Sequence, residues 1–153
     1  MLLAIDLGLH TGYALYGVDG RLRSYRSQHF GALNVLKRAA YTILGTTPDV
    51  THLVMEGGGA VAHVWEQVAQ RKNIAVEIIG AERWRQRLLY DREQRSGEIA
   101  KATADELARR VIAWSGALKP TSLRHDAAEA IMIGLWGVLE YGWLPAVPPE
   151  VRR

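Results

Sequence analysis

Four acidic residues occupy positions from which their carboxylates could share divalent metal ions. Asp6 and Glu56 each follow a short apolar run, and Asp126 and Glu129 are three residues apart, which places both on one face of a helix. Oxygen ligands of this kind select Mg²⁺ or Mn²⁺. Two such ions, about 3.5–4 Å apart, activate a water molecule and stabilise the leaving oxygen of a phosphodiester. The four residues therefore indicate hydrolysis of a phosphodiester bond.

Each acid also has an interpretation outside catalysis. Asp6 lies before Leu-Gly and fits a turn-forming aspartate, and Asp126 with Glu129 fit acids favoured by a helix N-terminus. Glu56 is harder to assign to packing, because it closes the apolar run Leu53–Met55. Four carboxylates gathered without a cation would repel one another by about 4 kcal/mol for each close pair, at an effective dielectric of about 20. If the fold gathers them, we expect a divalent cation among them.

The predicted secondary structure describes a mixed α/β sheet. Apolar runs and glycine-containing turns predict strands at 2–5, 12–16, 21–28, 51–55 and 75–79, and helices at 33–44, 61–72, 81–89, 99–114 and 123–139. The first three strands are expected to be antiparallel, and the later βαβ order makes the remaining strands parallel. This layout resembles the ribonuclease H-like fold, a mixed five-stranded sheet flanked by helices. If their strands are adjacent, Asp6 and Glu56 lie about 5 Å apart and face one cleft.

The length and composition fit one domain. A chain of 153 residues is large enough for a core, and we expect the ribonuclease H-like domain at 1–144. An irregular C-terminal tail is expected at 145–153, because Pro145, Pro148 and Pro149 cannot continue a helix. The absence of cysteine excludes disulfides and thiolate metal ligands. No apolar run approaches the roughly 20 residues of a membrane span, and signal-peptide features are missing, so a soluble, cytoplasmic protein without a membrane partner is expected.

Basic residues are concentrated in one segment of the chain. The formal net charge is +3 and the isoelectric point is about 9.4, which agrees with a nucleic-acid partner. Six cations lie within nineteen residues: Arg83, Arg85, Arg87, Arg92, Arg95 and Lys101. This segment is predicted to contact DNA phosphates. The alternative is a solvated helix face with ordinary ion pairs.

Three parts of the sequence carry a recognisable family pattern. They are Ala4–Gly8 followed by Thr11–Tyr13, the strand-ending Glu56, and His125–Ala130. Together they resemble the RuvC family of Holliday junction resolvases over nearly the whole chain. The resemblance implies a ribonuclease H-like fold, a homodimer, two Mg²⁺ or Mn²⁺ ions per active site, and paired symmetric nicks across a four-way DNA junction. It implies that catalysis and metal binding belong to Asp6, Glu56, Asp126 and Glu129.

The resemblance also implies roles for two of the basic residues. Lys101 would hold the scissile phosphate or stabilise its developing charge, and Arg85 would contact the DNA backbone. Both residues also fit the interpretation of ordinary surface cations.

Two positions depart from the family pattern. Glu129 stands where the bacterial family usually has aspartate, which lengthens the ligand arm by one methylene group. The family commonly places an aromatic residue after the second acid to open the junction, but here Glu56 is followed by Gly57–Gly59. Trp65 or Tyr90 could supply an aromatic surface instead, although Trp65 belongs to an apolar helical stripe that faces either its own sheet or a partner.

Other functions are also compatible with parts of this sequence. Sugar kinases and actin-like ATPases open with the same Asp-x-Gly-x-x-Thr-Gly pattern, but they have two related domains, and no second copy of this opening is present. Another nuclease of the same fold, acting on flaps, branched DNA or RNA–DNA hybrids, would use the same acids. A non-catalytic nucleic-acid-binding module would keep the basic segment without needing the four carboxylates.

Overall fold

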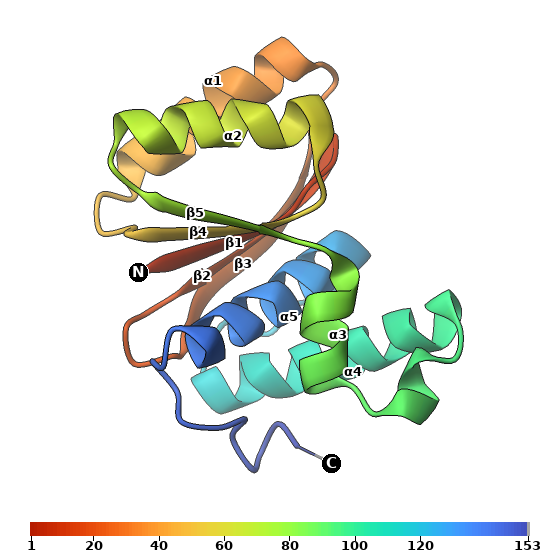
Figure 1. The fold of residues 1–153 in the computed structure, drawn as a ribbon. Helices are drawn as coiled ribbons and strands as arrows, with labels where there is room; N and C mark the ends of the chain where they lie inside the picture. The colour runs from red at the N-terminus through yellow and green to blue at the C-terminus, as the bar shows by residue number, and fades with distance from the viewer. Residues whose placement is uncertain (153) are drawn as a thin grey trace.

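The computed structural model describes residues 1–152, which form one five-stranded sheet with helices on both faces (Figure 1). The strands are β1 (Leu2–Asp6), β2 (His10–Tyr16), β3 (Leu22–His29), β4 (His52–Glu56) and β5 (Ala75–Ile79). The helices are α1 (Leu33–Thr46), α2 (Gly59–Arg71), α3 (Ala81–Leu88), the 3₁₀ helix η1 (Asp91–Gln94), α4 (Gly97–Ser115) and α5 (His125–Glu140). The strand order is β3-β2-β1-β4-β5, with β1 antiparallel to β2 and parallel to β4. The predicted mixed sheet is confirmed.

Two separate cores lie on the two faces of the sheet. Helices α1 and α2 cover one face, while α3, α4 and α5 lie on the other (Figure 1). On the first face, Val64, Trp65 and Val68 of α2 are buried with strand residues such as Leu53. The apolar stripe of α2 therefore packs against its own sheet, which decides between the two alternatives left open by the sequence.

Helix α5 lies directly on the sheet, with α3 and α4 packed against it (Figure 1). It is apolar on almost every side because it is enclosed from both directions, and its residues from 127 to 139 are all buried. Glycine at position 134 permits the close approach, because a Cβ there would stand 2.2 Å from the Tyr16 ring. The Tyr16 hydroxyl also donates a hydrogen bond to the carbonyl oxygen of Ile131, at 2.6 Å. These contacts hold the middle of α5 beside the sheet.

The segment between α3 and α4 contains the short helix η1, which the sequence did not predict. The Glu93 carboxylate accepts a hydrogen bond from the backbone N–H of Tyr90, and the Glu93 N–H donates to the Tyr90 carbonyl oxygen, both at 2.9 Å. This reciprocal capping forms a tight turn. Helix α4 then begins after Ser96, whose side chain accepts a hydrogen bond from the Ile99 N–H, and ends before Gly116 in the left-handed conformation.

Residues 145–152 contain no helix or strand, and Arg153 lies outside the described residues. This part of the chain is nevertheless packed on the core: Val151 is buried among residues of the α3–α4–α5 face. Arg110 of α4 also donates a hydrogen bond to the carbonyl oxygen of Arg152, at 2.8 Å. Within residues 1–152, no helix combines the length and apolarity needed to span a bilayer.

Gly12 of β2 is the point of closest approach between the sheet and the start of α5. A Cβ at this position would stand 1.9 Å from the carbonyl oxygen of Asp126, so Gly12→Ala must push the two elements apart. We expect this variant to lose at least about 3 kcal/mol of unfolding free energy in urea titrations, because backbone atoms rather than a flexible side chain must move. Gly31→Ala is the matched control, since a Cβ there has no atom within 4 Å. Equal stability of the two variants would contradict the packing described here.

Candidate active site

Asp6 and Glu56 are the last residues of two adjacent strands. Strands β1 and β4 are parallel neighbours in the centre of the sheet, and their register pairs Asp6 directly with Glu56. The carboxyl ends of parallel strands meet at one edge, so both side chains leave the sheet at the same place. The apolar residues that precede each acid are buried, which anchors the two carboxylates to a rigid base.

Helix α5 brings the other two acids to the same edge. Asp126 lies in its first turn and Glu129 one turn further, where it is buried at 9% exposure. Burial, followed by the negative charges of Glu129, Glu56 and Asp126 and a hydrogen bond with Glu129, raises the pKa of Asp6 from its ordinary value of 3.8 to about 8. All three other acids therefore act on Asp6 at close range. The structure brings the four predicted acids together.

Protein donors occupy three of these carboxylates. The Trp84 indole Nε1–H donates to Oε2 of Glu56 at 2.5 Å, and the Arg85 guanidinium pairs with Oε1 of Glu129 at 3.2 Å. The Asp126 carboxylate accepts from the hydroxyl of Ser27 on β3 and from the backbone N–H of Ala127 at the start of α5. Trp84 and Arg85 are consecutive residues of α3. This helix therefore supplies partners to acids from both β4 and α5.

The chemistry of this donor set fits a divalent cation. Four carboxylates converge where burial and mutual repulsion drive Asp6 to retain its proton, and a bound cation would remove that conflict. Among residues 1–152, no three His, Asp or Glu side chains are arranged to hold one metal ion as they stand. The donors described above hold the carboxylates instead, so a bound ion would have to replace some of these contacts.

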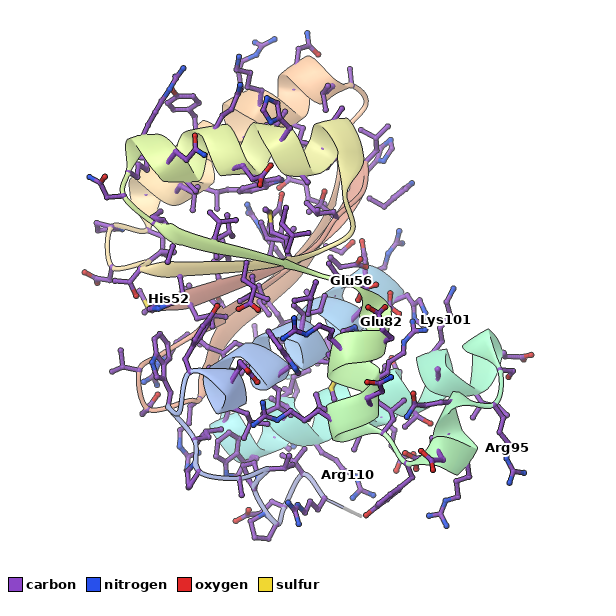
Figure 2. All side chains as sticks on the ribbon, in the orientation of Figure 1. His52, Glu56, Glu82, Arg95, Lys101 and Arg110 are labelled. Carbon is purple, nitrogen blue, oxygen red and sulfur yellow. The ribbon has the colours of Figure 1, made fainter. Side chains whose placement is uncertain are left out.

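Glu82, in the first turn of α3, is an additional acid that the sequence interpretation did not select. Burial raises the pKa of Glu56, and the negative charges of Glu129 and Glu82 add to the rise. The Trp84 hydrogen bond and the Arg85 charge act in the opposite direction. Figure 2 shows Glu82 beside Glu56 at this end of the sheet. A usable signal was present: Glu82 comes three residues after Ile79, which is the register partner of Glu56 on β5.

The structure distributes the predicted DNA-binding arginines over different surfaces. Arg83 lies 3.8 Å from the Glu77 carboxylate and over the Trp136 ring, and Arg87 pairs with Glu140 at the end of α5. These two residues are four positions apart and share one face of α3, whereas Arg85 points into the acid cluster. Arg83 and Arg87 therefore have protein partners away from the four acids.

The remaining basic residues are exposed beyond α3. Arg92 lies over the ring of Tyr90, at 5.3 Å, while Arg95 and Lys101 form no ion pair with any residue from 1 to 152. Figure 2 shows Lys101 on the same flank of the molecule as Glu56, with Arg95 at the outer corner near η1. Of these two cations, Lys101 is therefore the one on the flank of the acids.

The segment after Glu56 presents no side chain to a ligand. Gly57 and Gly59 have positive φ values of 121° and 71°, which glycine adopts without strain. Of the two aromatic residues considered as substitutes for the missing aromatic, Trp65 is fully buried, whereas Tyr90 is 54% exposed. Tyr90 is therefore the one of this pair whose ring a ligand can reach.

The pKa of Asp6 makes the stability of the cation-free protein depend on pH. The folded state holds this proton up to about pH 8, whereas the unfolded chain releases it near 3.8, so the stability contributed by protonated Asp6 is lost as pH rises through this range. Asp6→Asn does not titrate. In EDTA, this variant should become progressively more stable than the wild type from pH 4 to 8, by at least about 2 kcal/mol at the upper end. Urea titrations that give parallel pH profiles for both proteins would contradict the described charge repulsion.

Comparisons with known proteins identify the fold. No protein-family model and no curated protein matches the chain. The solved structure of Thermus thermophilus RuvC in complex with a Holliday junction substrate matches with 13% identity and a TM-score of 0.66, over 92% of this chain and 94% of that chain. A second T. thermophilus RuvC structure matches with 14% identity and a TM-score of 0.66, over 92% and 95% of the two chains. The chain therefore has a RuvC-like, ribonuclease H-like fold, as the sequence resemblance implied.

Proposed function

We propose that this protein is a metal-dependent, structure-selective DNA endonuclease that resolves four-way junctions. The observation that carries this proposal is the convergence of Asp6, Glu56, Asp126 and Glu129 at one edge of a RuvC-like sheet. A protein of that fold is known in complex with a Holliday junction substrate, which supports branched DNA as the ligand here. The four carboxylates supply the chemistry for phosphodiester hydrolysis.

In this proposal the four acids hold Mg²⁺ or Mn²⁺, with two ions per active site. The bound ions supply an activated water and stabilisation of the leaving oxygen. Asp6 and Glu56 provide ligands from the rigid sheet, and Asp126 and Glu129 provide them from the first turns of α5. Arg85, whose guanidinium already lies among the acids, would contact a phosphate beside the cut. Lys101 would contact the scissile phosphate from the exposed flank of α4.

Paired incision requires two active sites. Two symmetric cuts on a junction of approximate two-fold symmetry are most simply made by two identical sites related by a two-fold axis, so we include a homodimer in the proposal. The apolar stripe of α2 is used inside the protomer and is not available for this interface. Mapping the two cut positions on one junction tests the paired arrangement directly.

One structural feature favours a second candidate function. The backbone after Glu56 carries three glycines and therefore no side chain that could be inserted into a junction. A nuclease of this fold that accepts other branched DNA, flaps or RNA–DNA hybrids would have the same acids with this open segment. A substrate panel distinguishes the two functions.

Asp6→Asn should abolish cleavage and leave junction binding within about twofold of the wild type, because it removes a ligand oxygen without changing the exposed cations. Wild type and variant are incubated with a four-way junction, linear duplex, flap and RNA–DNA hybrid in Mg²⁺, and binding is measured separately in Ca²⁺. Cleavage of the junction at symmetric positions supports the proposal. Preferential cleavage of flaps or hybrids supports the second candidate, and nicking by Asp6→Asn at the wild-type rate would reject the acids as the catalytic group.

Lys101→Ala should slow cleavage more than it weakens binding. Loss of a cation that stabilises developing charge on the scissile phosphate is expected to reduce the single-turnover rate about 100-fold. Junction affinity should fall by no more than about threefold, since one phosphate contact is lost. Arg95→Ala is the matched control, because Arg95 is also exposed and also forms no ion pair within residues 1–152. Equal losses in cleavage rate and junction affinity for Lys101→Ala would show that this residue is an ordinary contact to the DNA backbone.

A further inference from the structure

Trp84 connects the interior of the protein to the acid cluster. Its ring is fully buried in the core between α3, α4, α5 and the sheet. Its indole N–H nevertheless reaches the edge of that core and donates to Oε2 of Glu56 at 2.5 Å. The indole nitrogen can only donate a hydrogen bond, so the carboxylate oxygen of Glu56 is the acceptor in this contact.

Glu56 has few other restraints beyond the end of its strand. The residues that follow are Gly57–Gly59, none of which has a side chain that could pack against the glutamate. A glutamate side chain has three rotatable bonds, and fixing it in one rotamer requires a partner that is itself fixed. Trp84 meets that condition because the core surrounds its ring. The indole is therefore the contact that selects the rotamer of Glu56.

We propose that Trp84 is a positioning residue for Glu56, an inference that rests on the proposed function. The indole holds one oxygen of the carboxylate, and the other oxygen would be available to a divalent ion shared with Asp6 and the acids of α5. Residues that orient a metal ligand in this way commonly change metal affinity or activity by about 10–100-fold when they are replaced. Trp84 does not touch the substrate in this arrangement and acts only through Glu56.

Trp65 is a matched control inside the same molecule. It is also fully buried and lies in the core on the other face of the sheet. Its indole nitrogen has no hydrogen-bond partner among the described residues. Trp84→Phe and Trp65→Phe therefore remove the same atoms from equally buried sites, but only Trp84→Phe removes a contact to an acid of the cluster.

The test compares wild type, Trp84→Phe and Trp65→Phe in three measurements. Mn²⁺ binding is titrated without DNA by electron paramagnetic resonance, junction cleavage is measured against Mg²⁺ concentration, and junction affinity is measured in Ca²⁺. Trp84→Phe should weaken Mn²⁺ binding and raise the Mg²⁺ requirement by about 10–100-fold, with junction affinity within about twofold of the wild type. Trp65→Phe should match the wild type in all three. Unchanged Mn²⁺ binding by Trp84→Phe, or an equal loss in Trp65→Phe, would overturn the inference.

A measurement that leaves Trp84 in place covers the case in which Trp84→Phe fails to fold. With ¹⁵N-labelled tryptophan, the indole proton of Trp84 should resonate downfield because of its bond to a carboxylate, and it should move upfield in Glu56→Ala. The signal of Trp65 should not move. The inference is wrong if the Trp84 signal is also unchanged in Glu56→Ala.

Failure of this inference is distinguishable from failure of the proposed function. A wild type that binds Mn²⁺ but cuts no branched DNA, together with selective loss of Mn²⁺ binding in Trp84→Phe, would reject the nuclease assignment and keep the positioning role. A wild type that cuts junctions, together with normal Mn²⁺ binding by Trp84→Phe, would keep the nuclease assignment and reject the positioning role. A wild type that binds no Mn²⁺ would reject both.

Discussion

Repulsion between carboxylates that the sheet forces together is the constraint around which this end of the molecule is organised. Parallel pairing of β1 with β4 places Asp6 beside Glu56 with no freedom to separate, and α5 adds Asp126 and Glu129 to the same edge. The fold tolerates this arrangement through a proton retained by Asp6 and through donors from Ser27, Trp84 and Arg85. Groups with strongly perturbed pKa values cluster at functional sites, and the repulsion among these acids is the reason we propose a function that uses divalent ions.

The packing of α3, α4 and α5 on one face of the sheet stabilises the fold despite the repulsion between the acids. Helix α5 lies close to β1 and β2 because small residues face the sheet, and its apolar surface is covered by α3 and α4. Helix α3 then reaches the carboxyl end of the sheet directly after β5, so its first turns lie against the acids. The same packing that buries Trp84 therefore brings two hydrogen-bond donors, Trp84 and Arg85, to the acids. The stability of the fold and the geometry of the site depend on the same contacts.

The sequence was informative where a pattern depends on local periodicity. The strand at Ala75–Ile79 agrees with the prediction, the other strands and the α-helices differ from it only at their ends, and the 3₁₀ helix η1 was not predicted. Two apolar runs that each end in an acid predicted that Asp6 and Glu56 would face one cleft if their strands were adjacent, and the structure places β1 beside β4. Contacts that depend on the rotation of a helix about its axis could not be obtained in this way. Arg85 was predicted to contact DNA as one of a basic segment, and the sequence did not show that it pairs with Glu129 while Arg83 and Arg87 face the other side of α3. Residue density along a chain does not specify which face each residue occupies, and for the same reason Trp84 was not selected.

The pairing of β1 with β4 joins residues fifty positions apart in the chain, and α5 adds acids seventy positions further on. No local segment can assemble such a set of ligands, so the set exists only after the central strands and the last helix have docked. Any ion that binds all four acids therefore binds the native state and not the unfolded chain. Its binding free energy would be added to the folding free energy, so the concentration of divalent ions would control how much of the protein is folded as well as how fast it acts.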